Sequence, residues 1–218
     1  MAELVNISQK AAIDRALREI RSGNVIALPL DNGYIFACDA FNRMAVRALH
    51  LLRNDPVGQA ASLLIGDPAR IVGIAREITP AAQALMDKFW PGMLTLYMRP
   101  HSALTWDLGD ERLLDQIAVR APHEEFVVQL LNESGPLAVA GAALSGRKPF
   151  TDPTLINDVF GSSIELIFEN VAISGSKPSA TESTVVDCTS TPPQIIRQGA
   201  VEYSSLLEAW PDISQDVD

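Results

Sequence analysis

The sequence predicts a mixed α/β (α+β) fold in which a large twisted sheet is flanked by helices. Helical and strand-like patterns alternate in the first half of the chain, and short strand-like segments dominate the second half, which is typical of a mixed sheet with covering helices. The 218 residues, 47% of them hydrophobic, are enough to build one core without a disulfide or a metal. We expect a single domain over residues 1–203 and a partly disordered C-terminal tail over residues 204–218.

The expected helices are marked by capping residues that precede an apolar stripe or by a proline at the first helical position. They run from Ser8 to about Ser22, from Asn42, from Asp67–Pro68, from Thr79–Pro80 to before Pro91, from His123 to Ser134, and across residues 150–161.

The expected strands are short apolar segments rich in β-branched residues. They cover residues 24–30, 62–66, 93–99, 116–122, 135–146, 164–168, 183–188 and 193–199. The alternating pattern of residues 93–99 predicts a strand with one face in water. The polar residues 101–115 are expected to form an excursion over the surface.

The charge balance counts against a nucleic-acid-binding surface. The chain has 17 basic and 27 acidic residues, a net charge of −10, and electrostatic capture of nucleic acid needs a basic face. No apolar run approaches the roughly 20 residues that cross a bilayer, and the N-terminus lacks a signal-peptide pattern. We expect a cytoplasmic protein with no membrane association. Cys38 and Cys188 have no metal-ligand spacing and are predicted to be buried free thiols.

Standard catalytic and cofactor motifs are absent. No G-x-G-x-x-G follows a strand, so a dinucleotide-binding fold has no support. Residues 141–149 resemble a phosphate-binding loop, but Pro149 stands where a Ser or Thr would hold magnesium. His50, His101 and His123 share no ligand spacing. Structural or solvated roles are expected for these histidines, and no metal site is predicted.

Polar side chains follow several of the predicted strands, where a rigid sheet could present them to a ligand. These residues are Asp31, Asn32, Tyr34, Arg120, Ser183, Thr184 and Arg197. Two arginines that converge on one site would favour a phosphate or a carboxylate. The alternative is that each arginine is simply a solvated residue at a strand end.

Six segments in order resemble the motifs of the YrdC-like family, the threonylcarbamoyl-AMP synthases of tRNA threonylcarbamoyladenosine biosynthesis. They are GNVIALPLDNGY (23–34), FWPGMLTL (89–96), AVRAP (118–122), PLAVAGAALSG (136–146), STVVD (183–187) and IRQGA (196–200). The likeness runs from about residue 11 to residue 201. It implies the YrdC-like fold, with a concave ligand site, and a reaction of ATP, L-threonine and bicarbonate that yields threonylcarbamoyl-AMP and pyrophosphate.

The same resemblance implies site residues and partners. ATP, with Mg²⁺, would be a substrate rather than a tightly bound cofactor, and other tRNA-modification proteins would be partners. The implied nucleotide-binding residues are Arg53, Arg120, Ser183 and Arg197, and the implied threonine pocket is Asp31, Asn32 and Tyr34.

The chain departs from the family pattern within the site motifs. The replaced positions are Leu30 and Asn32 for threonines, Asp55 for an arginine, and Val139, Ala140, Gly141 and Ala143 for hydroxyl and amide side chains. Asp55 puts a carboxylate where a phosphate should bind, and the other changes remove hydrogen-bonding groups. These changes predict a synthase-type protein with weakened or lost catalysis. The alternative is a non-catalytic paralogue that acts as a nucleotide-binding or assembly module.

Overall fold

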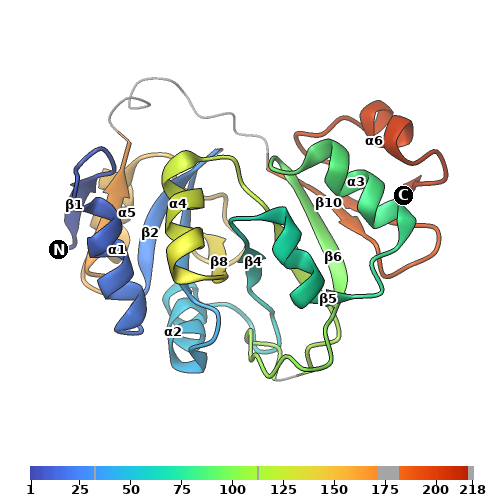
Figure 1. Cartoon of the computed structure of the whole chain (residues 1–218). Coiled ribbons are helices and arrows are strands. Elements are labelled where there is room, and N and C mark those ends of the chain that lie inside the picture. The colour runs from blue at the N-terminus through green and yellow to red at the C-terminus, as the bar shows by residue number, and fades with distance from the viewer. Residues whose placement is uncertain (32, 112, 171–181, 216–218) are drawn as a thin grey trace.

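A computed structural model describes residues 1–31, 33–111, 113–170 and 182–215 (Figure 1). Its strands are β1 (Glu3–Asn6), β2 (Ile26–Leu30), β3 (Gly33–Asp39), β4 (Ser62–Leu64), β5 (Ala75–Arg76), β6 (Leu94–Pro100), β7 (Ile117–Arg120), β8 (Leu137–Gly141), β9 (Leu166–Glu169), β10 (Thr184–Asp187), β11 (Gln194–Arg197) and β12 (Ser214–Gln215). Its helices are α1 (Ala12–Arg21), α2 (Arg43–Arg53), the 3₁₀ helix η1 (Pro68–Gly73), α3 (Pro80–Phe89), α4 (Glu125–Ser134), α5 (Pro153–Phe160) and α6 (Tyr203–Ala209).

One continuous mixed sheet connects the described strands. Its order is β1-β9-β2-β3-β8-β4-β7-β6-β10-β11-β12, and β5 pairs with β6 beside this path. The pairs β2–β3, β3–β8 and β6–β7 are antiparallel, whereas β4–β7 and β6–β10 are parallel. The predicted fold class, a large mixed sheet flanked by helices, is therefore confirmed.

Helices α1 and α4 lie side by side and cover one face of the sheet (Figure 1). Leu17 of α1 and Leu130 of α4 are buried in one hydrophobic cluster with Leu28 of β2 and Phe168 of β9. The apolar stripe of α1 that the sequence shows is the part of the helix that enters this cluster.

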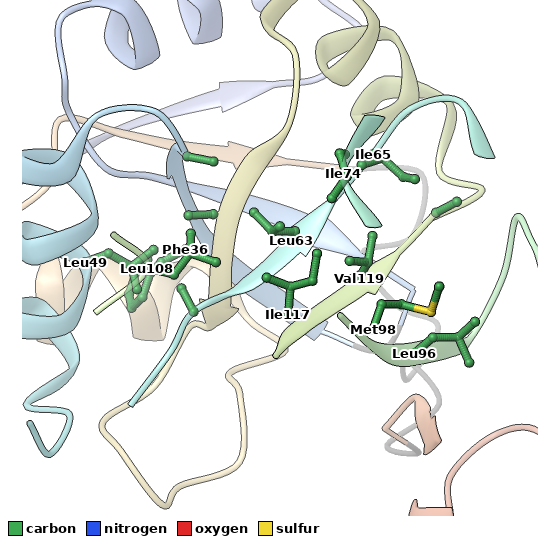
Figure 2. Packing of buried hydrophobic residues seen from close by; sticks show 14 of the residues in the cluster. Phe36, Leu49, Leu63, Ile65, Ile74, Leu96, Met98, Leu108, Ile117 and Val119 are labelled. Atoms are coloured by element: carbon green, nitrogen blue, oxygen red, sulfur yellow. The ribbon is translucent and has the colours of Figure 1, made fainter. Parts of the chain in front are cut away.

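A second and larger hydrophobic cluster takes side chains from α2, α3, α5 and α6. Figure 2 shows part of it, where Leu63 of β4, Val119 of β7 and Met98 of β6 lie among the buried side chains. The rings of Phe36 and Phe160 meet edge to face, with centroids 5.0 Å apart. This contact joins β3 to α5.

Most of the predicted helix starts are confirmed by capping hydrogen bonds. The side chain of Asn42 accepts from the backbone N–H groups of Met44 and Ala45 at the start of α2. The Thr79 hydroxyl oxygen accepts in the same way at the start of α3. The Ser8 cap was wrong, because α1 begins at Ala12 without a side-chain cap and the Ser8 hydroxyl donates to Asn6 instead.

The expected wet face of β6 is present in part. Leu94, Leu96 and Met98 are buried on one face, whereas on the other face Tyr97 is half-buried and Arg99 is exposed.

The expectation that residues 101–115 only run over the surface is wrong. The excursion over residues 101–115 buries Trp106 and Leu108 against the larger cluster, and the Leu108 carbonyl accepts a 2.8 Å bond from Ala61 N–H. Apolar residues inside a polar stretch therefore anchor this loop.

Strands β1 and β3 were not predicted. Strand β3 forms an antiparallel hairpin with β2, in which Leu30 pairs with Gly33. This hairpin carries Asp31 just after β2 and Tyr34 within β3. Asn32 lies outside the described residues.

The C-terminal segment was expected to be a tail from residue 204, and as far as Gln215 this expectation is wrong. Leu206 of α6 is fully buried, and the Lys88 ammonium of α3 pairs with Glu208 at 2.8 Å. Strand β12 pairs in parallel with β11. Residues 204–215 therefore belong to the folded body.

Both cysteines are free and buried, as predicted. Burial raises the thiol pKa of Cys38 and of Cys188 to about 12. Neither thiol therefore has the lowered pKa of a reactive cysteine. Among the described helices, none combines the length and the apolar character needed to cross a bilayer.

Truncation of Leu206 tests the structural role of α6. We expect Leu206→Ala to lower the free energy of unfolding by about 2–5 kcal/mol, because it leaves a cavity in the core. The control Leu155→Ala removes the same atoms from a side chain that is 47% exposed, and it should cost less than about 0.5 kcal/mol. Urea unfolding measures both variants. If Leu206→Ala and Leu155→Ala lowered the free energy of unfolding equally, residues 204–215 would not be part of the cooperative fold.

Candidate functional site

Arg120 is buried at the end of β7 and is held by three neighbouring groups. Its Nε donates to the Gly92 carbonyl at 2.7 Å, and its Nη2 donates to Asp31 Oδ2 and lies 3.0 Å from the Met93 sulfur. The side chains of Arg120 and Asp31 are each only 7% exposed. Burial lowers the pKa of Arg120 to about 10, although the charge of Glu124 opposes this effect. The pair is a buried ion pair that fixes both groups.

Ser183 and Arg197 form a second cluster beside Arg120. The Ser183 hydroxyl is buried and lies 3.0 Å from the Thr95 hydroxyl. Arg197 Nε and Nη2 donate to the Ser183 carbonyl at 3.2 and 3.0 Å, and Arg197 Nη1 pairs with Glu182 at 3.0 Å. The side chain of Arg197 is 45% exposed, so it can reach a ligand in solvent.

The segment before β6 links these two clusters. The Gly92 carbonyl accepts from Arg120, and the Met93 carbonyl accepts from Thr184 N–H at 3.0 Å. Three of the four predicted nucleotide-binding residues, Arg120, Ser183 and Arg197, are therefore brought together by one short loop.

Arg53, the fourth predicted nucleotide-binding residue, is enclosed in another cluster. Its Nη1 donates to the Gly141 carbonyl and, at 3.0 Å, to the Ala143 carbonyl. Its Nε donates to Asp55 Oδ2 at 3.0 Å. Its backbone carbonyl accepts from Ser145 N–H. Arg53 is 7% exposed, so its guanidinium acts here as a bridge between α2 and the loop after β8.

Asp55 does not present an open negative charge to a ligand, and that expectation is corrected. Its side chain is fully buried, and Oδ2 lies 2.9 Å from His50 Nδ1 and 3.0 Å from Arg53 Nε. Burial acts to raise the pKa of Asp55, but hydrogen bonds from Arg53, His50 and Ser145 outweigh it and hold this pKa below its ordinary value. The charge of Asp55 is thus paired within the protein through Oδ2, whereas its buried Oδ1 has no hydrogen-bond partner among the described residues.

The replaced positions in β8 do not all line one surface. Val139 belongs to the cluster under α1 and α4, whereas Ala140 packs against the larger cluster on the other face. Alternation along a strand forces this separation. The side chains at these replaced positions therefore point to opposite faces of the sheet, and they do not all line a single pocket. Leu30 and Ala143 are buried as well.

Gly141 is required by close packing with the loop that follows β8. A Cβ atom at Gly141 would lie 2.7 Å from Pro149 Cγ. Phe150 continues this loop, and its carbonyl accepts from Tyr34 N–H at 2.9 Å. Burial raises the pKa of the Tyr34 hydroxyl, and the charges of Glu169 and Asp152 add to the effect. Because Gly141 has no side chain, the loop that contains Pro149 and Phe150 packs over this position and takes the place of an open pocket.

A model of the Sua5–YciO–YrdC family, described as telomere recombination, matches residues 18–199. The chain belongs to this family. The resemblance to the YrdC-like proteins in the sequence is thereby confirmed.

Individual relatives of the family agree in sequence and in structure. A putative threonylcarbamoyl-AMP synthase of Mycobacterium tuberculosis is 30% identical over 193 residues, which cover 88% of this chain and 86% of that protein. The Pyrococcus abyssi Sua5 structure complexed with L-threonine superposes with a TM-score of 0.88 at 26% identity. It covers 98% of this chain, which spans 62% of that longer chain.

Escherichia coli YciO has the same fold. Its structure superposes with a TM-score of 0.82 at 24% identity and covers 95% of this chain and 100% of YciO.

Several residues of the candidate site were not predicted individually from the sequence. Gly92, Met93 and Thr95 lie in the FWPGMLTL segment that carried part of the resemblance, so this motif could have indicated them. The partnership of His50 with Asp55 could also have been suspected, because the spacing of five residues spans the end of a helix. Nothing in the sequence indicated the contact between Pro149 and Gly141, because it depends on how the loop after β8 folds back over the strand.

Restoring a hydroxyl at Gly141 should strain the structure. We expect Gly141→Ser to lower the free energy of unfolding by about 1–3 kcal/mol, because the new side chain overlaps Pro149. Ala140→Ser adds the same hydroxyl at the neighbouring position and should cost less. Urea unfolding compares the two. If Gly141→Ser were as stable as the original protein, the packing by Pro149 would be refuted.

Loss of the Asp55 charge should destabilise the protein near neutral pH. We expect Asp55→Asn to cost about 3–5 kcal/mol, because it leaves Arg53 buried without its counter-ion. The control Asp158→Asn changes an exposed carboxylate on α5 and should cost less than about 0.5 kcal/mol.

The Asp55 contribution also has a defined pH dependence. Because the folded pKa is lowered, the stabilisation is fully present above the ordinary value of about 4 and is lost as pH falls through the lower folded pKa. Unfolding curves at pH 7 and pH 3 should show the gap between the original protein and Asp55→Asn narrowing in acid. A gap that stays constant would contradict the assignment.

Proposed function

We propose that this chain is a threonylcarbamoyl-AMP synthase-type protein of tRNA modification. It binds ATP, with Mg²⁺ as part of the substrate, and L-threonine, and it forms threonylcarbamoyl-AMP and pyrophosphate from them and bicarbonate. Its turnover is well below that of relatives with intact motifs. It acts in the cytoplasm, where other tRNA-modification proteins use the product.

The observation that carries this proposal is the likeness to named synthases along nearly the whole chain. The 30% identity to the Mycobacterium tuberculosis protein covers 88% of this chain, and a Sua5 complex with L-threonine has a TM-score of 0.88. The convergence of Arg120, Ser183 and Arg197 supports it, because a triphosphate needs charge-assisted donors. In this assignment Arg197 contacts a phosphate, and Arg120 positions Asp31 and the Gly92–Met93 backbone.

The weakened turnover follows from the enclosed Arg53. Its Nε donates to Asp55, and its Nη1 donates to the carbonyls of Gly141 and Ala143. A ligand phosphate would have to displace these protein acceptors from a buried cation. Displacement of hydrogen bonds to a charged group costs about 1.5–3 kcal/mol each.

The second candidate is a non-catalytic paralogue that retains nucleotide binding or acts as an assembly module. The same enclosed Arg53 favours it, because Asp55 and backbone carbonyls already pair with this guanidinium when no ligand is present. The two candidates differ in turnover and share the family fold.

Pyrophosphate release separates the two candidates. The purified full-length protein is incubated at high concentration with ATP, L-threonine and bicarbonate, beside a relative with intact motifs. Slow release that requires all three substrates supports the synthase. No release, with ATP binding intact by calorimetry, would leave the paralogue. No binding at millimolar ATP would remove the nucleotide site from both candidates.

Arg197 provides a sharper test of the nucleotide site. We expect Arg197→Gln to weaken ATP binding by about tenfold or more, because a charge-assisted bond to phosphate is worth about 1.5–3 kcal/mol. Arg99→Gln is a matched control, since Arg99 also lies on a strand and is 48% exposed, against 45% for Arg197. Calorimetry with ATP measures both variants. Equal affinities would place the nucleotide elsewhere.

A further inference from the structure

Three side chains with metal-ligating atoms meet beside the Arg120–Asp31 ion pair. One ligating atom from each of Asp31, His123 and Glu124 lies within 4.8 Å of the others. Asp31 follows β2, whereas His123 and Glu124 immediately precede α4. Two segments far apart in the sequence therefore bring two carboxylates and one imidazole to one point.

The orientation of Asp31 supplies an independent observation. Its side chain is 93% buried, since only 7% is exposed, and Arg120 uses Oδ2. In the part of the chain that the structure describes, the buried Oδ1 atom accepts no hydrogen bond. His123 Nδ1 lies 3.0 Å from this oxygen. A buried carboxylate oxygen without a hydrogen bond is costly unless a cation satisfies it.

From this geometry we propose that Asp31, His123 and Glu124 bind a divalent first-row transition metal ion. Adjacent ligands of an octahedral ion with bonds of about 2.1 Å lie about 3.0 Å apart, which matches the separation of Asp31 Oδ1 and His123 Nδ1. The carboxylate of Glu124 is half-buried, and its ligating oxygen lies within 4.8 Å of the other two ligand atoms, so it completes the three-ligand set. The remaining positions take water from the exposed side of His123.

The donor set selects the kind of metal. An imidazole nitrogen favours zinc and other late first-row ions over Mg²⁺ and Ca²⁺, and carboxylates are compatible with Mn²⁺ and Zn²⁺. The site is distinct from a magnesium ion carried by ATP, because the protein itself supplies all three ligands.

Two positive groups near the site repel a metal ion, and the two carboxylates of the site compensate for this repulsion. The guanidinium of Arg120 offsets one carboxylate, and the N-terminal end of α4 carries a partial positive charge. Two carboxylates against one guanidinium leave one net negative charge for the metal when His123 is neutral. The solvent-exposed ring of His123, 57% exposed, leaves a path for entry.

The test titrates the full-length protein, stripped with a chelator, with Mn²⁺ followed by electron paramagnetic resonance. No nucleotide or threonine is present, so the outcome is independent of the proposed function. We expect one Mn²⁺ per chain and displacement by Zn²⁺, which such donors bind more tightly. His123→Ala and Glu124→Gln should each weaken binding by about tenfold or more, since even outer-shell partners of a metal contribute 10–100-fold.

Glu125→Gln is the matched control. It removes the same charge from the adjacent, exposed residue of α4 and should leave binding unchanged. Circular dichroism checks that every variant is folded. No saturable binding of Mn²⁺ or Zn²⁺ up to millimolar concentration would overturn the proposal. Unchanged affinity in His123→Ala or in Glu124→Gln, or an equal loss in Glu125→Gln, would overturn it too and indicate only nonspecific attraction to surface carboxylates.

Discussion

The buried ion pair between Arg120 and Asp31 organises the candidate site. It joins the end of β7 to the β2–β3 hairpin, and the same guanidinium holds the Gly92 carbonyl of the loop before β6. That loop in turn bonds to Thr184 at the start of β10. A buried charge without its partner is strongly destabilising, so the two charges hold these five strands in one arrangement.

Strand register alone does not place Arg120 beside Asp31. Strand pairing aligns Arg120 with Leu64, Leu64 with Leu137, and Leu137 with Asp39. Asp39 lies at the end of β3 far from the hairpin turn that carries Asp31. In a flat sheet the two charges would therefore be far apart. The contact between Arg120 and Asp31 therefore depends on how the sheet curves in three dimensions and not on strand register.

Two different kinds of polar cluster result. Arg197 remains half exposed beside Ser183, whereas Arg53 is enclosed by Asp55 and by backbone carbonyls. Of these two arginines, Arg197 is the one whose side chain keeps surface for a ligand. Asp55 pairs through Oδ2 with His50 and Arg53 inside the protein, so its charge is not presented to solvent.

The sequence by itself determined the family, the mixed sheet with its helices, and the caps at Asn42 and Thr79, because these depend on local pattern and on motif order. It also indicated Arg120, Ser183 and Arg197 as neighbours. Only the tertiary structure decided that Asp55 is buried against Arg53 and that Gly141 is covered by Pro149. The physical reason is that charge compensation and close packing depend on the partner across space. Partners that lie far apart in the sequence, or that a folded-back loop brings together, leave no periodic signal along the chain.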